Sequence, residues 1–178
     1  MQINHPGRQA NLAAFRTQPV APSAVALKVP GASKPRALTG AEIEDIIERF
    51  ATTAVVAETA GFNGVQVHGA HGYLVAQFLS PLSNLRDDEW GGDPERRMRF
   101  VVEVVRRIRS RVTPSFAVGI KLNSADFQRG GFSEEESRDV VAALAGEGLD
   151  LIEVSGGSYE APAMMGSAAK STRDREAY

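Results

Sequence analysis

Short β-branched segments alternate with amphipathic helical segments along most of this chain. The expected strands cover residues 1–5, 64–68, 115–122 and 149–155. Stretches with the helical spacing of apolar residues lie between the later strands. Parallel strands joined by helical crossovers are the usual outcome of this order. The sequence therefore predicts an α/β fold, either a doubly wound sheet or a TIM (β/α)8 barrel.

Capping signals indicate where the helices between the strands begin. Three helices are expected, and each opens on a residue that can accept a hydrogen bond from the first turn. The opening residues are Thr39 with Glu42, Asp93 with Pro94, and Ser133 with Glu136. We expect the first of these helices to end near Gly61.

Each expected strand has one apolar face and one small or polar face. In the third strand the apolar side comprises Phe116, Val118, Ile120 and Leu122, and the other side comprises Ala117, Gly119 and Lys121. A doubly wound sheet, covered by helices on both faces, more often has strands that are apolar on both sides. Barrel enzymes instead place polar side chains near the carboxyl ends of the strands, at the active face. This pattern favours the barrel.

Composition narrows the possible partners and the location. The formal net charge of -2 gives no field that would gather nucleic acid or anionic lipid. The chain has no cysteine, which excludes disulfides and thiolate metal sites. No run approaches the roughly 20 apolar residues that span a bilayer. We therefore expect no nucleic-acid partner, no membrane partner and, by default, a cytoplasmic location.

The length predicts a single domain, residues 1–178, that spans only part of a barrel, because TIM barrels typically contain about 250 residues. Residues 9–38 are rich in Pro, Ala, Ser and Gln and are expected to form a long surface excursion. The first five residues already have the pattern of a strand, with no cap or turn before them. Residues 170–178 have charged, helical character with no capping glycine, so both ends are expected to be cut from a longer sequence.

One stretch holds most of the chemical information: GFNGVQVHGAHGYL at 61–74, continued by QFLSP at 77–81 and WGG at 90–92. It resembles the signature of the old yellow enzyme family of FMN-dependent reductases. The segments QINHPGR, VGIKL and VSGG, beginning at residues 2, 118 and 154, extend the resemblance. The sequence departs from the family at Gln66 and Trp90, where Glu and Tyr often stand. The resemblance implies strands three to six of the barrel, about four βα units of eight.

His68 and His71 lie three residues apart just past a strand, so both imidazoles can reach one point above the sheet. Such a pair could bind a substrate, ligate a metal together with an acidic residue, or be ordinary buried polar residues. The resemblance implies the first role, in which both rings donate hydrogen bonds to the carbonyl oxygen of an α,β-unsaturated, enone-like substrate.

The resemblance implies roles for three further residues. Tyr73 would protonate the α-carbon of the substrate, and Gln2 and Lys121 would bind FMN, with NADH or NADPH as the electron donor. Each has a simpler alternative. Tyr73 could pack over the barrel mouth, and Lys121 could extend its ammonium group to solvent.

Three functional hypotheses follow. The chain could be part of an active NAD(P)H:flavin oxidoreductase of the ene-reductase type. It could instead be an inactive half-barrel or an interaction module that forms a homo-oligomer and holds no flavin. The third hypothesis is a metal-dependent lyase or hydrolase that uses His68, His71 and Glu153. Neither GxxxxGK[ST] nor GxGxxG occurs, so these nucleotide-binding loops give no support to a kinase or a Rossmann enzyme.

Overall fold

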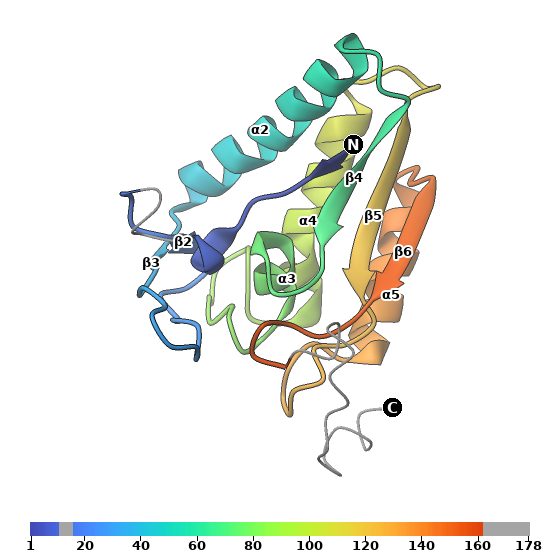
Figure 1. The fold of residues 1–178 in the computed structure, drawn as a ribbon. Helices are drawn as coiled ribbons and strands as arrows, with labels where there is room; N and C mark the ends of the chain where they lie inside the picture. The colour runs from blue at the N-terminus through green and yellow to red at the C-terminus, as the bar shows by residue number, and fades with distance from the viewer. Residues whose placement is uncertain (11–15, 162–178) are drawn as a thin grey trace.

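The computed structural model describes residues 1–10 and 16–161 and contains a four-stranded parallel sheet (Figure 1). Its strands are β1 (Gln2–Ile3), β4 (Gly64–Gly69), β5 (Ala117–Asn123) and β6 (Leu151–Ser155). They lie in the order β1-β4-β5-β6, which is also their order along the chain. All four strands predicted from the sequence are therefore present, and they are arranged as successive strands of a barrel wall.

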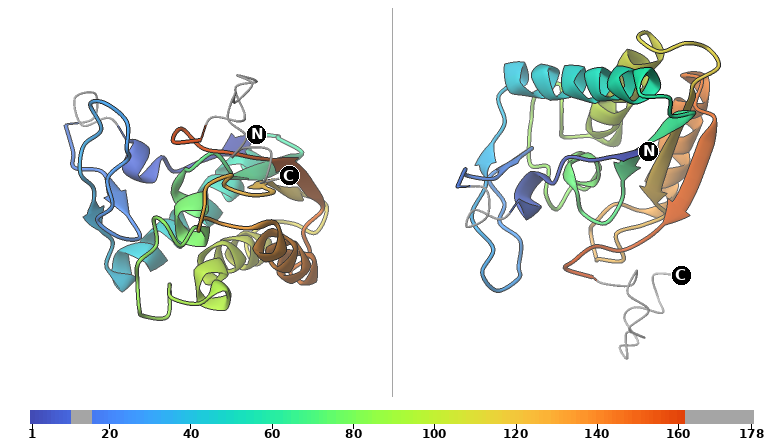
Figure 2. Two further views of the ribbon diagram at one scale, coloured as in Figure 1. Left: turned by 90° about the horizontal axis from the view of Figure 1, so that it is seen from below. Right: turned by 45° about the horizontal axis from the view of Figure 1, so that its top comes forward.

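Three long helices cover one face of this sheet (Figures 1 and 2). They are α2 (Gly40–Thr59), α4 (Pro94–Arg109) and α5 (Glu134–Gly146). α4 lies between the other two and packs against both. The core between the helices and the sheet contains mainly aliphatic side chains, together with a stacked pair of rings, Phe78 and Phe100, whose centroids are 4.1 Å apart.

The predicted caps form as the sequence indicates. The Thr39 side chain accepts from the backbone N–H of Glu42 while the Glu42 carboxylate accepts from that of Thr39, and Ser133 and Glu136 form the same reciprocal pair. Asp93 caps α4 ahead of Pro94. Gly61 has a φ of 86° and closes α2 in a Schellman arrangement, in which Phe62 N donates to Ala57 O. Local sequence therefore sets both ends of α2.

The alternation predicted for the strands is confirmed in β4 and β5. Val118, Ile120 and Leu122 point into the helix-covered core and are buried, whereas Lys121, on the other face, is partly exposed. In β6 the alternation persists but the burial does not, since Val154 is 70% exposed. Val154 lies on the helix-covered face, at the edge strand, and no helix of the described residues follows β6.

Several elements are absent from the sequence prediction. α3 (Leu74–Leu79) follows its N-cap residue Tyr73, whose side chain makes no capping hydrogen bond. The helix has only six residues, so periodicity could not reveal it. A 3-10 turn, η1 (Gly7–Gln9), leads into the long excursion, which contains two short parallel strands, β2 (Val20–Ala21) and β3 (Arg36–Ala37). The helical character expected at 170–178 lies outside the described residues.

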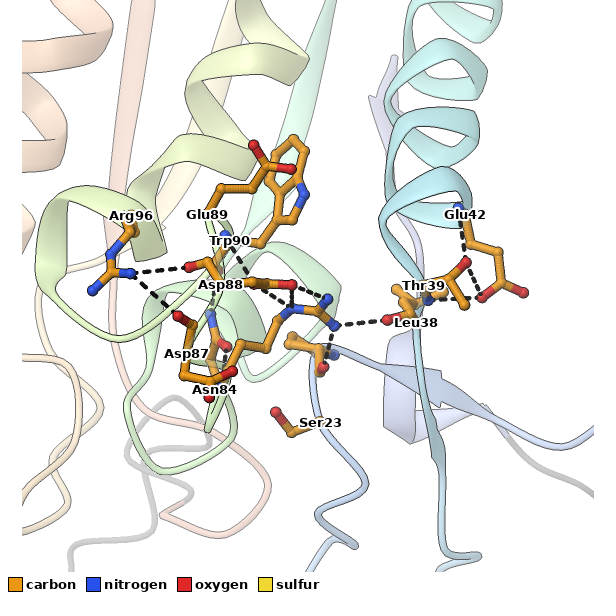
Figure 3. Close-up of polar contacts among 12 residues, drawn as sticks. Ser23, Leu38, Thr39, Glu42, Asn84, Asp87, Asp88, Glu89, Trp90 and Arg96 are labelled. Atoms are coloured by element: carbon orange, nitrogen blue, oxygen red, sulfur yellow. Dashed lines mark hydrogen bonds and ion pairs between the residues drawn. The ribbon is translucent and has the colours of Figure 1, made fainter.

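Arg86 braces the excursion against the loop that precedes α4, whose residues Asn84, Asp88 and Trp90 are labelled in Figure 3. Its Nη1 donates to Pro22 O at 2.9 Å and to Leu38 O at 2.7 Å, and its guanidinium pairs with Asp88. Nearby, Asn84 Nδ2 donates to Trp90 O at 2.9 Å. These polar residues hold loop geometry and stand apart from the histidines. Among the described residues, no helix is both long and apolar enough to cross a membrane.

Replacing Thr39 by alanine is expected to lower the free energy of unfolding by about 1 kcal/mol, because the first turn of α2 loses a capping acceptor. Chemical denaturation followed by circular dichroism measures this change. Thr53→Ala is the matched control, because Thr53 is exposed within the same helix and alanine is a better helix former. Equal destabilisation by both substitutions would contradict the capping role.

Candidate active site

The polar residues singled out from the sequence converge at the carboxyl ends of the strands. The register pairs His68 of β4 with Lys121 of β5, and Lys121 with Glu153 of β6. Residues in register on neighbouring parallel strands point to the same face, which here is the face opposite α2 and α4. His71 and Tyr73 follow His68 in the loop before α3. One short segment therefore supplies three side chains to one place.

His68 is only 7% exposed and lies between the other two rings. Its ring centroid is 5.2 Å from that of His71 and 4.8 Å from that of Tyr73, both edge-to-face. Its Nδ1 accepts from Ala70 N at 3.3 Å, which places the proton of the neutral ring on Nε2. Burial, followed by the charges of His71 and Lys121, lowers the pKa of His68 to about 4. At neutral pH His68 is an uncharged hydrogen-bond donor.

His71 occupies a left-handed backbone conformation, with a φ of 59°. Two side chains fix its peptide: Asn123 Oδ1 accepts from His71 N at 3.2 Å, and Gln9 Nε2 donates to His71 O at 2.8 Å. Its Nε2 lies 2.7 Å from Ser155 Oγ. Burial, assisted by Lys121, lowers the pKa of His71 as well. The loop therefore presents His71 in one defined orientation.

Tyr73 is the residue at which α3 begins, and its hydroxyl lies 3.3 Å from that of Tyr159. The hydrogen bond with Tyr159, followed by burial, raises the pKa of Tyr73 to about 12. The phenol is therefore protonated across the physiological range. It is an acid placed beside two neutral imidazoles.

A chain of polar contacts crosses all four strands and joins the two predicted cofactor residues. Gln2 Nε2 donates to Gln66 Oε1 at 2.7 Å, Gln66 Nε2 donates to Glu153 Oε2 at 2.8 Å, and Glu153 Oε1 pairs with Lys121 Nζ at 2.8 Å. Gly119, in register with Gln66 on β5, has no side chain on this face to obstruct the contact with β6. The amide of Gln66 both accepts and donates, which a glutamate at this position could not do.

Sequence reasoning missed several members of this site. Glu153 was expected on the polar face and considered as a metal ligand, but not as a partner of Lys121. Asn123, whose Nδ2 also donates to Gly157 O at 2.9 Å, was not considered at all. Both lie on β5 or β6 at or near the carboxyl end, so strand position was the available signal. Within residues 1–10 and 16–161, no group of three or more His, Asp or Glu side chains is arranged to hold a metal ion.

A model of the NADH:flavin oxidoreductase / NADH oxidase family matches residues 1–175. The chain belongs to this family. An NADH oxidase of Thermoanaerobacter brockii is 44% identical over 90% of this chain, which covers 25% of that relative. Family membership confirms the cofactor and the electron donor predicted from the resemblance, which are FMN and NADH or NADPH.

Solved structures of flavin oxidoreductases are similar to this fold. A 2-naphthoyl-CoA reductase complex superposes with a TM-score of 0.85 at 32% identity, over 90% of this chain and 26% of that one. An old yellow enzyme homologue from Zymomonas mobilis gives 0.75 at 25% identity, over 99% of this chain and 53% of that one. The fold is therefore part of a TIM (β/α)8 barrel. The chain spans between a quarter and about half of these proteins.

The side chains on the polar face suit the ring of the family's flavin. The pyrimidine edge of an isoalloxazine ring presents hydrogen-bond acceptors and one N–H donor. Gln2 offers an amide with both functions, and Lys121 offers a cation on the same face, 2.8 Å from its carboxylate partner. Gln2 and Lys121 are therefore chemically suited to FMN, the cofactor that family membership supports.

His68 is expected to stay neutral down to about pH 4, against 6.5 for an unperturbed histidine. Because its folded-state pKa is the lower one, the unfolded chain binds this proton more readily in that window. The free energy of unfolding should therefore fall as the pH drops from about 6.5 to about 4. NMR titration of the imidazoles measures the midpoint, and His68→Asn should weaken the pH dependence. A midpoint for His68 at or above that of free histidine would refute this prediction.

Proposed function

We propose that this chain forms the substrate-facing and flavin-ring-facing part of an FMN-dependent reductase. When bound, FMN would supply hydride-transfer chemistry, with NADH or NADPH as the electron donor and an activated alkene, such as an α,β-unsaturated carbonyl compound, as the acceptor. The observation that carries the proposal is the contact of His68 with both His71 and Tyr73 on the sheet face that bears Lys121. Family membership supports the redox chemistry, and the alkene substrate is the one that the resemblance of residues 61–74 to the old yellow enzyme family implies.

In the proposed reaction the two imidazoles bind the carbonyl oxygen of the substrate. His68 donates from Nε2, because Ala70 N occupies its Nδ1. His71, held by Asn123 and Gln9, provides the second donor from Nδ1, with its Nε2 accepting from Ser155 Oγ. Negative charge develops on that oxygen as the β-carbon receives hydride. Fixed donors that meet such charge typically contribute a factor of about 10²–10³ each.

Tyr73 is the proposed acid for the α-carbon. Its hydroxyl is protonated at neutral pH, since the hydrogen bond with Tyr159 and burial raise its pKa to about 12. The α-carbon of the enolate, which is the base in this step, takes a proton from such a phenol only when the two atoms are held close together. The position of Tyr73 at the start of α3, in contact with His68, provides that placement.

We propose that the active site is completed by further barrel strands at both edges of the sheet. β1 and β6 are the edge strands. Beside β1, a cavity of about 360 Å³ opens between the strand and α2, with Ile46 and Phe50 in its lining. On β6, Leu151 is 59% exposed and Val154 is 70% exposed. Barrel phosphate sites usually lie after strands seven and eight, so the FMN phosphate would be bound there.

Removal of either imidazole should slow alkene reduction and leave flavin bound. We expect His68→Ala or His71→Ala to lower kcat for 2-cyclohexen-1-one by about 10²-fold, because one oxyanion donor is lost. Tyr73→Phe should reduce enone turnover while NADH oxidation by oxygen continues, since that reaction protonates no carbon. Steady-state assays with FMN-loaded protein measure both rates. Glu103→Gln is the control, because that carboxylate pairs with Arg106 on α4, one of the helices that cover the opposite face of the sheet.

Loss of the positive charge on β5 should weaken flavin binding. Lys121→Met is expected to raise the Kd for FMN several-fold, since the cation beside the pyrimidine edge is removed. Lys34→Met, in the excursion before α2, is the control. Fluorescence quenching of FMN measures both constants. Equal affinities for the two variants would contradict the role of Lys121.

The exposed edge residues also favour a second function, an inactive half-barrel that assembles with another copy through its sheet edges. Unpaired strand edges and exposed apolar side chains promote such pairing. Flavin absorbance of the purified chain, combined with light scattering, separates the two proposals. Bound flavin with enone turnover supports the reductase, whereas a flavin-free oligomer supports assembly.

A further inference from the structure

The segment Gly156–Ala161, which follows β6, lies against the loop that holds His71. Ser158 pairs with His71 in an isolated parallel bridge, and Gly157 O accepts from Asn123 Nδ2 at 2.9 Å. Gln128 Nε2 donates to Ser158 Oγ at 3.1 Å. The segment is therefore tied both to the β4 loop and to the loop after β5.

Tyr159 is the residue of this segment that reaches the candidate site. Its hydroxyl lies 3.3 Å from the Tyr73 hydroxyl, and the two rings meet edge-to-face with centroids 6.2 Å apart. Tyr159 is 44% exposed. One phenol thus faces the histidines and contacts a second phenol that is open to water.

A buried ion pair anchors the next residue. Arg8 Nη2 lies 2.6 Å from Glu160 Oε2, and the two side chains are only 7% and 10% exposed. The other carboxylate oxygen accepts from Lys28 N at 2.8 Å. The backbone of Arg8 is itself fixed, because its N donates to Gln77 Oε1 of α3 at 3.1 Å. The ion pair therefore joins the Gly156–Ala161 segment to the helix that begins at Tyr73.

We propose that Tyr159 is a positioning residue, which orients the Tyr73 hydroxyl and connects it to solvent, and that the Arg8–Glu160 ion pair holds it there. This inference rests on the proposed role of Tyr73 as the acid. The proton that Tyr73 gives to the α-carbon leaves a phenolate oxygen. That oxygen takes the proton of the Tyr159 hydroxyl, and Tyr159 takes one from water, so each group regains its starting state.

The electrostatics of the pair agree with this geometry. Two phenolates at hydrogen-bond distance repel each other, so the pair gives up its second proton reluctantly. The contact with Tyr159, followed by burial, accordingly raises the pKa of Tyr73. Without the Tyr159 hydroxyl, only burial would raise the pKa of Tyr73.

Titration of the tyrosines by NMR tests the proposal. The chain contains three tyrosines, Tyr73, Tyr159 and Tyr178, and a Tyr178→Phe background leaves two carbon-13 Cζ signals to follow. Tyr159→Phe keeps the ring but removes the hydroxyl, and we expect it to lower the midpoint of Tyr73 by about one pH unit or more. Glu160→Gln should move the midpoint in the same direction, because the anchor of the segment is lost.

Glu103→Gln is the matched control. It removes a carboxylate that pairs with Arg106 on α4, remote from the tyrosines, and it should leave the Tyr73 midpoint unchanged. A Tyr73 midpoint that is the same with and without the Tyr159 hydroxyl would overturn the proposal. The readout requires no flavin. Failure to bind FMN would thus count against the reductase function alone, and an unchanged midpoint against Tyr159 alone.

Discussion

Parallel pairing of β4 with β5 is the constraint on which the rest of the structure depends. It aligns His68 with Lys121 and, through β5, with Glu153 of β6, so that these three side chains point away from the helices. The same register buries Val67 and Ile120 together against the helices. A slip of one residue would exchange the two faces, exposing the aliphatic side chains and burying a lysine without its carboxylate. The same strand register therefore both buries the core and assembles the site.

Much of this arrangement could be predicted from local sequence. The reciprocal caps at Thr39 and Ser133 and the alternation in β4 and β5 involve residues near each other in the chain, so short-range patterns reveal them. α3 escaped prediction because six residues give too little periodicity. The Arg8–Glu160 pair escaped because its partners are separated by 152 positions and no local signal joins them. The exposure of Val154 likewise depends on what packs beside β6, which its alternation does not encode.

The residues of the candidate site likewise fall into those that local sequence reveals and those that it does not. The clustering of His68, His71 and Tyr73 follows from their position at the end of one strand, which the sequence displays directly. Their supports come from elsewhere: Asn123 from β5, Gln9 from the first loop and Tyr159 from the segment after β6. The candidate catalytic side chains were thus easier to predict than the side chains that contact them. Gln66, a departure from the family pattern, connects the two predicted cofactor residues, and this connection is visible only once the strands are in register.

The left-handed backbone at His71 restricts which amino acids can replace it. β-Branched and bulky side chains are strained at this φ of 59°, whereas asparagine tolerates it unusually well. Asparagine also carries an amide N–H₂ group that can donate a hydrogen bond. It would therefore preserve both the loop conformation and a hydrogen-bond donor, which makes asparagine the replacement for His71 that backbone sterics and chemistry both favour.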